Sequence, residues 1–450
     1  MQKLTGVHFY INICNFDQII LDEENRTGKI TYALHALDTY FSSIENFGKK
    51  ASKNLVIEKI TGSRLHLYVV DAPLSAFRIV KDVSVYAYRL SKYITTEILK
   101  YKPLKDFYIN VGAAYGKFYD FEFTTREGFS ELTTIGYAAN FAAKLQSFSG
   151  RSNISISEDI YDVLSSDEKK LYVKIEEPSI EKYGQDKYYK TYLYKIASSI
   201  PITDADLAAA KSYANSDNLG DINFANVRAP LNFQALSKTQ CKKLEGIPVF
   251  ADIRGFTSQF EEDDSNLEEM AQKTQRILNA MYRASTEHGG IHVQFQGDRE
   301  LSLYHNVPGS IIDGKSEKKC FKAAVLAAMR MIDAVKPFNV HIGVGEAFGE
   351  LFATKIGARG EKDNILLGRT IIVADSMEDK NAREDQIAIT NEVYYGLQTE
   401  DKDLARQFKR VGDYFITTVG YQRYQSNVAY KLQHDNTTRN NYNGAWGDLK

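Results

Sequence analysis

Cysteine is scarce in this chain: Cys14, Cys241 and Cys320 are the only three among 450 residues. They have neither metal-site spacing nor a disulfide framework, so we expect reduced thiols in a cytoplasmic protein. Long apolar runs are absent too, and without a stretch of about 18 apolar residues the sequence predicts no membrane-spanning helix. Residues 1–4 also lack the charged and apolar regions of a signal peptide.

An excess of either charge is likewise missing. The chain carries 56 Lys and Arg residues against 58 Asp and Glu, a formal net charge of −2. Such a balance creates no broad basic field, so we expect neither nucleic acid nor a membrane as a partner. An anionic substrate would have to be held by a few local charges. The length is sufficient for two or three domains, each with its own core.

What the sequence does contain, twice, is an aspartate at the end of a short apolar run. The first, Asp252, lies in Val-Phe-Ala-Asp-Ile-Arg-Gly-Phe-Thr at 249–257 and runs into a glycine turn. The backbone N–H groups near Gly255, Phe256 and Thr257 are suited to hold a phosphate. This turn is therefore a candidate phosphate site.

The second aspartate, Asp298, follows Gly297 between the apolar runs 291–295 and 301–304, a pattern that predicts a β-hairpin. Two carboxylates beside a phosphate-binding turn suit one or two Mg²⁺ ions, which prefer carboxylates together with substrate phosphates. Between the two motifs a helical pattern places apolar side chains on one face, at Leu267, Met270, Ala271, Thr274, Ile277, Leu278 and Met281.

Together these features resemble the catalytic domain of the class III adenylate and guanylate cyclases. In that family an F-x-D-I-x-G-F-T strand and turn and a later G-D hairpin supply two metal-binding aspartates. The resemblance implies that Asp252, Ile253 and Asp298 hold two Mg²⁺ or Mn²⁺ ions. It also implies that Phe256 and Thr257 hold the β- and γ-phosphates of a nucleoside triphosphate.

A second copy of the unit lies in the first half of the chain, at an offset of roughly 235 residues. In that copy Asn12 occupies the position of Asp252, and Ser63 occupies the position of Asp298. Two further pairs of stretches match, 109–116 with 342–349 and 135–144 with 367–376.

This repeat predicts two tandem cyclase homology domains that form a pseudo-dimer within one chain. We expect the domains at 1–197 and 243–434, a linker at 198–242 and a disordered tail at 435–450. The fold class is α/β, an α+β sandwich in which helices cover the sheets. Helices are expected at 28–47, 83–100, 136–147, 207–214, 266–287, 318–334 and 369–379.

The differences between the copies are complementary. In class III cyclases one domain gives the metal aspartates, and its partner gives a base-reading pair, a ribose Asn and a transition-state Arg. The resemblance places the base-reading pair at Lys59 and Thr133, the ribose Asn at Asn140 and the transition-state cation at Lys144, which replaces arginine.

The second copy has lost the ribose and transition-state positions, which are Ile372 and Ser376. We therefore expect one working site and one dead site, both formed within a single chain that may also oligomerise further. Pyrophosphate contacts are expected from Arg359, with Lys187 and Lys190 as weaker candidates, and surface charge is the alternative for all three.

The identity of the base stays open. Lys59 and Thr133 resemble an adenine-reading pair, yet uracil O4 and cytosine N3 would also accept hydrogen bonds from such donors. The hairpin 294–299 and the bare catalytic unit resemble the Pycsar pyrimidine cyclases of anti-phage defence, whose product activates a separate effector. We favour UTP over CTP, with ATP as the alternative and a catalytically inactive nucleotide sensor as a third hypothesis. No role is assigned to the histidines, among them His292.

Overall fold

The computed structural model describes residues 1–98, 103–124, 130–175, 179–182, 185–188, 190–196, 203–216, 223–227, 229–236, 240–256, 266–307, 319–357 and 363–428. The predicted tail at 435–450 lies outside these residues. Where the chain is described, no helix is both long enough and apolar enough to cross a membrane.

The first half builds one large sheet with helices on its face and a small hairpin beside it. Its strands run in the order β2-β3-β1-β4-β6-β10-β7, with β5 paired to β4. The elements are β1 (Gln2–Ile13), α1 (Phe16–Thr27), α2 (Thr31–Ala51), β2 (Leu55–Thr61), β3 (Arg64–Val69), α3 (Pro73–Ser91), β4 (Ile109–Thr124), β5 (Ser130–Ile135), α4 (Tyr137–Phe148), β6 (Asn153–Ile156), α5 (Glu158–Asp162), α6 (Ser166–Lys169), β7 (Tyr172–Ile175), β8 (Ser179–Lys182), β9 (Gln185–Tyr188) and β10 (Thr191–Lys195).

The second half repeats this plan. Its main path runs β13-β14-β12-β15-β18-β20-β19, with β16 on β12 and β17 on β16. The elements are β12 (Gln240–Ile253), α8 (Leu267–Glu287), β13 (Ile291–Gln296), β14 (Arg299–His305), α9 (Phe321–Val335), β15 (Ile342–Glu346), β16 (Gly349–Ile356), β17 (Asp363–Leu367), α10 (Arg369–Ser376), β18 (Gln386–Thr390), α11 (Asn391–Glu400), α12 (Lys402–Ala405), β19 (Lys409–Val411) and β20 (Tyr414–Thr417).

Strand registers show that the two halves match position by position. Asn12 pairs with Arg64 across β1 and β3, just as Asp252 pairs with Arg299 across β12 and β14. Each neighbouring hairpin carries a bulge at the same place, before Lys59 in β2 and before Gln294 in β13. The hairpin predicted around Gly297 is therefore present in both halves.

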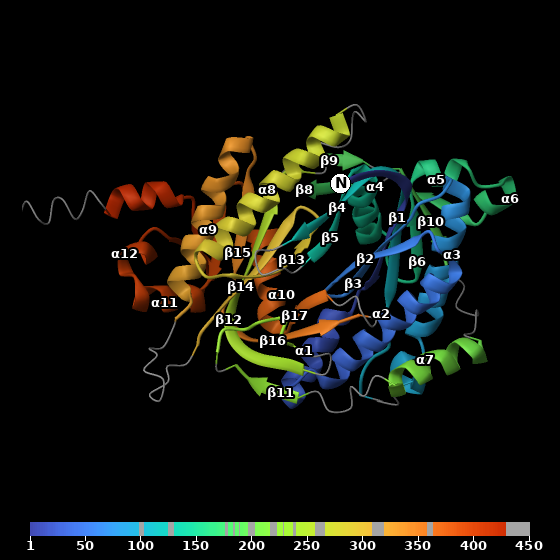
Figure 1. Ribbon diagram of the computed structural model, residues 1–450, viewed down its shortest axis with the longest axis horizontal. Helices are drawn as coiled ribbons and strands as arrows, with labels where there is room; N and C mark the ends of the chain where they lie inside the picture. Colours follow the sequence, from blue (N-terminus) through green and yellow to red (C-terminus); the bar gives the residue numbers. More distant parts are fainter. Residues whose placement is uncertain are drawn as a thin grey trace, which may run out of the picture.

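Each half also extends two strands into the core of the other; we call these strand pairs the exchanged arms. Side chains of β16 and β17 pack in the core of the first half: Phe352, Ile356, Ile365 and Leu367. Reciprocally, side chains of β4 and β5 pack in the core of the second half: Tyr119, Phe121, Phe123 and Ile135. In Figure 1 the two halves lie side by side, with α2 and α3 on one outer side and α8 and α9 on the other. The fold is thus an intramolecular pseudo-dimer.

The predicted linker contains more structure than a single short helix. Helix α7 (Asp204–Ser216) packs on the first half, where Ala210 is part of the core. Strand β11 (Asn223–Asn226) pairs in parallel with β12, whose first residue, Gln240, already lies inside the predicted linker range. The segment between the halves therefore contributes to both of them.

Two predicted helices were placed wrongly. The range 28–47 misses α1 entirely, and a left-handed Gly28 separates α1 from α2. The range 83–100 begins ten residues late, because α3 starts at Pro73, a residue that favours the first position of a helix. Helix α8 follows the prediction closely, and six of the seven apolar residues predicted on its face are buried.

A strand glycine positions the helix that carries Asn140 and Lys144. A Cβ at Gly112 would lie 2.1 Å from the backbone nitrogen of Gln146 and 2.2 Å from the carbonyl oxygen of Ala142. Gly345 has the same role in the second half, where a Cβ would lie 2.2 Å from the backbone nitrogen of Glu378. Strand and helix approach this closely only without a side chain.

Gly112→Ala is therefore expected to lower the free energy of unfolding by about 1–3 kcal/mol, the usual range for overpacking. Urea denaturation measures the change. The control is Gly116→Ala in the same strand, because a Cβ at Gly116 would lie 3.4 Å from Ala138 Cβ, an ordinary contact. Equal stabilities of the two variants would contradict the prediction.

Candidate functional site

The two predicted metal aspartates come from adjacent strands of the second half. Asp252 and Ile253 end β12, and the Asp252 side chain is 14% exposed. Asp298 lies in the turn between β13 and β14, which Gly297 makes possible with a φ of 72°. Because Asp298 directly precedes Arg299, the register partner of Asp252, the two aspartates are neighbours in the sheet.

The matching positions of the first half show how closely such neighbours approach. The Ser63 hydroxyl donates a hydrogen bond of 2.9 Å to Asn12 Oδ1. Asp252 and Asp298 occupy the same two positions in the second half. Among the described residues no group of three or more His, Cys, Asp or Glu could hold a metal. Two carboxylates and the Ile253 carbonyl fit Mg²⁺ or Mn²⁺ only when substrate and water complete the ligands.

An arginine that the sequence analysis missed fixes Asp252. Arg254 Nη1 lies 3.0 Å from Asp252 Oδ2 and 2.5 Å from Glu378 Oε1. Its Nη2 donates to the carbonyl oxygens of Glu378 and Ala382. A Cβ at Gly343 would lie 1.7 Å from Nη2, so the strand glycine makes room for the guanidinium. The metal side of the site is therefore held rigidly.

The predicted ribose and phosphate contacts lie on α4 of the first half. Asn140 and Lys144 are four residues apart, so they share one face of the helix. The Asn140 Nδ2 atom is buried and has no hydrogen-bond partner among the described residues. A buried amide nitrogen without a hydrogen-bond partner is costly. A bound ligand would supply the acceptor that the Asn140 side chain lacks.

The predicted base-reading pair is brought together at the interface. Lys59 Nζ donates to Thr133 Oγ1 at 3.0 Å and to the carbonyl oxygen of Phe295, in the other half, at 3.0 Å. It also forms an ion pair of 2.5 Å with Glu131 Oε1. Lys59 is 1% exposed and Thr133 0%, so a base reaches them only by entering between the halves.

Residues 242–434 match the adenylate and guanylate cyclase catalytic domain. The second half is therefore similar to the catalytic domain of the class III nucleotidyl cyclases. The curated uridylate cyclase of Pseudomonas aeruginosa is 21% identical over 271 residues, which cover 56% of this chain and 50% of that protein. The match thus spans half the length of this relative.

The cyclase fold extends over the first half as well. A crystal structure of a class III adenylyl cyclase-like ATP-binding protein from Pseudomonas aeruginosa superposes with a TM-score of 0.66 at 16% identity. The superposition covers 95% of this chain and 90% of that protein. The adenylyl cyclase CyaB from P. aeruginosa is 22% identical over 39% of this chain, with a TM-score of 0.32 and 93% of that chain covered.

The ammonium group of Lys59 has no spare donor in this structure. It carries three N–H groups, and the acceptors Glu131, Thr133 and the Phe295 carbonyl take all three. A base can accept from Lys59 only by displacing one of them. The sequence predicts the residues of this pair but not that its lysine is already saturated.

Glu131 and His292 extend this cluster of contacts around Lys59 into the second half of the chain. His292 Nε2 lies 3.2 Å from Glu131 Oε2, and its Nδ1 lies 3.0 Å from a Glu300 carboxylate oxygen. Burial would lower the pKa of His292, but Glu300 and Glu131 raise it to about 10. Burial would raise the pKa of Glu131, but Lys59 and His292 hold it below its ordinary value.

The cluster therefore holds charged His292 against charged Glu131 at neutral pH. Sequence analysis gave neither residue a role. The available signal was that Glu131 lies two residues before Thr133 on a strand, so both side chains point to the same face.

The other predicted phosphate contacts are less well placed or lie outside the described residues. Phe256 is buried beside Gly255, whose φ of 68° makes the turn. Thr257 and Arg359 lie outside the described part of the chain, as does the side chain of Lys187. Lys190 pairs with Glu158 at 3.0 Å on the surface, which matches the alternative of a surface charge.

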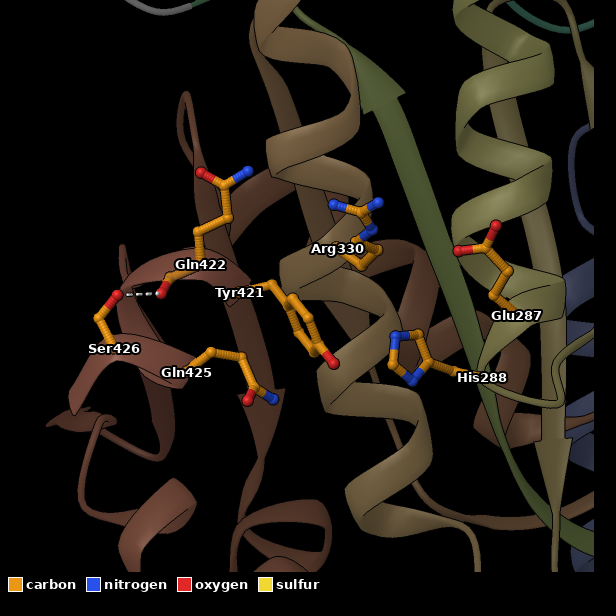
Figure 2. Close-up of a pocket in the computed structure, with 7 residues that line it drawn as sticks. All are labelled: Glu287, His288, Arg330, Tyr421, Gln422, Gln425 and Ser426. Carbon is orange, nitrogen blue, oxygen red and sulfur yellow. Dashed lines mark hydrogen bonds between the residues drawn. The ribbon is translucent and has the colours of Figure 1, made fainter. Parts of the chain in front are cut away.

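A cavity of about 560 Å³ lies elsewhere on the second half, between the ends of α8, α9 and the helix at 421–428. Figure 2 shows the side chains around it: Glu287, His288, Arg330, Tyr421, Gln422, Gln425 and Ser426. It contains none of the predicted site residues. The candidate active site lies instead at the interface of the halves, where Lys59, Thr133 and Phe295 meet.

Proposed function

We propose that this chain is a nucleotidyl cyclase that converts UTP into 3′,5′-cyclic UMP and pyrophosphate at one site shared by its two halves. The observation that carries the proposal is complementarity. The second half retains Asp252 and Asp298, and the first half retains Asn140 and a cation at Lys144. The first half has Asn12 and Ser63 in place of the two aspartates, and the Ser63 hydroxyl donates a hydrogen bond to Asn12 Oδ1.

The reaction moves one phosphorus between two oxygens. The ribose 3′-oxygen forms a bond to the α-phosphorus, the bond to the oxygen that bridges to the β-phosphorus breaks, and the 3′-hydroxyl proton is released. Divalent ions at Asp252, Ile253 and Asp298 would favour loss of that proton and neutralise the triphosphate.

The protein side chains position and stabilise the reacting groups. The unpartnered Asn140 amide orients the ribose, which raises the effective molarity of the attacking hydroxyl. Lys144 supplies positive charge where negative charge develops on the α-phosphate. A lysine lacks the bidentate fork of arginine, so we expect slow turnover. The turn at Gly255 and Phe256, with Thr257 and Arg359, would hold the remaining phosphates.

Two observations support uracil as the base. The relative with a matching sequence is a uridylate cyclase, and the Thr133 hydroxyl, whose oxygen accepts from Lys59, has a donor hydrogen that suits the uracil O4 carbonyl. Within the proposal the product is a cytoplasmic second messenger of anti-phage defence, read by a separate effector. CTP is the next candidate substrate.

Two alternatives remain: an adenylate cyclase and an inactive ATP sensor. Both are favoured by the similarity in fold to an adenylyl cyclase-like protein described as ATP-binding. The sensor hypothesis is also favoured by the lysine at position 144, where active family members have arginine.

Product identity tests the proposal. The purified chain is incubated with Mn²⁺ and separately with UTP, CTP, ATP or GTP, and the cyclic products are separated by chromatography. Cyclic UMP is the expected product. Cyclic AMP alone would establish the adenylate cyclase alternative, and ATP binding without any cyclic product would establish the sensor.

A further inference from the structure

The carboxylate of Glu131 contacts residues of both halves. Oε1 accepts from Lys59 at 2.5 Å and from the backbone N–H of Phe295 at 2.9 Å. Oε2 lies 3.1 Å from the same backbone nitrogen and 3.2 Å from His292 Nε2. Glu131 is 5% exposed, so these contacts replace water.

The contact with Lys59 determines what Thr133 can offer to a ligand. Lysine has only donors, so the Thr133 oxygen accepts from Lys59. The single hydroxyl hydrogen of Thr133 is therefore directed to a different acceptor. Towards a base, Thr133 is a hydrogen-bond donor.

The contact with Phe295 reaches the metal side of the site. Phe295 donates its N–H to Glu131 and accepts at its carbonyl from Lys59, so both backbone groups are held. It lies three residues before Asp298 on the hairpin β13–β14. Anchoring this backbone also anchors the turn that carries the metal aspartate.

We propose that Glu131 is a positioning residue that ties base recognition to the metal hairpin, a role that rests on the function proposed above. By holding Lys59 against Thr133 it makes Thr133 a donor towards the base. By holding Phe295 it fixes Asp298 relative to the base. Between bases of one size, a donor favours the O4 carbonyl of uracil over the N4 amino group of cytosine.

The second half provides a matched control. Asp363 occupies the position equivalent to Glu131, and its Oδ2 accepts from the backbone N–H of Ile60 at 2.7 Å. Ile60 is the counterpart of Phe295. Asp363 makes no contact with the Lys59 ammonium, whose partners are Glu131, Thr133 and Phe295. Asp363→Asn thus weakens the same kind of cross-half contact and removes none of the three hydrogen-bond partners of Lys59.

The experiment compares the wild type with Glu131→Gln, Thr133→Val and Asp363→Asn. Affinities for 3′-deoxy-UTP and 3′-deoxy-CTP are measured by calorimetry with Mg²⁺, because these probes bind without turnover. We expect the wild type to prefer 3′-deoxy-UTP by about tenfold, the usual effect of one good base contact. Glu131→Gln and Thr133→Val should both abolish this preference, and Asp363→Asn should retain it.

Kinetics with UTP separate positioning from simple contact. Glu131→Gln should also lower kcat, because the hairpin with Asp298 loosens, whereas Thr133→Val should change mainly KM. The double variant Glu131→Gln with Thr133→Val should distinguish 3′-deoxy-UTP from 3′-deoxy-CTP no less well than either single variant, since both changes act through the Thr133 hydroxyl.

A preference retained in Glu131→Gln, or lost equally in Asp363→Asn, would overturn the inference. If Glu131→Gln does not fold, a preference retained in Thr133→Val overturns it alone. The deoxynucleotide affinities remain decisive even if no cyclic product forms, so failure of the proposed function is seen separately.

Discussion

Asp252→Asn is expected to lower cyclic nucleotide formation by roughly a thousandfold, equivalent to about 4 kcal/mol of transition-state stabilisation. The change removes one of the two carboxylates of the proposed metal site. Asparagine keeps an oxygen that can accept from Arg254, and it is the natural residue at the matching position, Asn12. The fold therefore tolerates it, and the loss reflects chemistry. Initial rates with saturating Mn²⁺ measure the effect.

The converse change is the matched control. Asn12→Asp places a carboxylate in the degenerate half, which faces Ile372 and Ser376 where a working site needs Asn and a cation. We expect the rate per folded molecule to stay close to that of the wild type, because Asn12, which is buried against Asn110, belongs to the degenerate site and not to the proposed working site. Equal losses from Asp252→Asn and Asn12→Asp would contradict the asymmetric site.

A second large effect concerns stability. Glu346 ends β15 and is fully buried, and neither carboxylate oxygen has a hydrogen-bond partner among the described residues. Burial raises the pKa of Glu346 to about 8. The equivalent residue of the first half is Ala113, so the fold itself needs no carboxyl group at this position.

The raised pKa makes stability fall as pH rises. In the unfolded chain Glu346 ionises near pH 4.5, whereas in the folded chain it keeps its proton to about pH 8. Between these values the folded state binds one more proton, so the unfolding free energy decreases by about 1.4 kcal/mol per pH unit. The full change is on the order of 4–5 kcal/mol, present below pH 4.5 and lost by pH 8.

Glu346→Gln removes this titration while it keeps the shape of the side chain. The variant should gain stability over the wild type steadily from pH 5 to pH 8, and urea denaturation at several pH values measures the difference. All other titrating groups are common to both chains, so they cancel. A difference that does not change with pH would show that Glu346 is ionised in the folded protein.

The local features of the site were predictable from the sequence. Gly297 and Asp298 form a two-residue turn, which the positive φ of Gly297 makes possible. Gly255 makes the turn after Asp252 in the same way. Asn140 and Lys144 were instead assigned from the resemblance to the class III cyclases, since the repeat has Ile372 and Ser376 at the matching positions.

The partners of Lys59 were not predictable in this way. Glu131 lies 72 residues from Lys59 in sequence and 161 from His292, so no periodicity relates the three. Whether a lysine has a spare donor depends on the packing of the two halves against each other. Arg254 was missed for the same reason, since its acceptors at Glu378 and Ala382 come from a distant turn.

The exchanged arms bear on how the protein responds to dilution. Each half completes its core with strands from the other, so the shared site exists only while the halves are joined. In a dimer of separate chains that condition fails at low concentration. Here the covalent connection keeps the halves at an effective concentration on the order of millimolar. The pairing of the two halves is then independent of how many copies of the chain a cell contains.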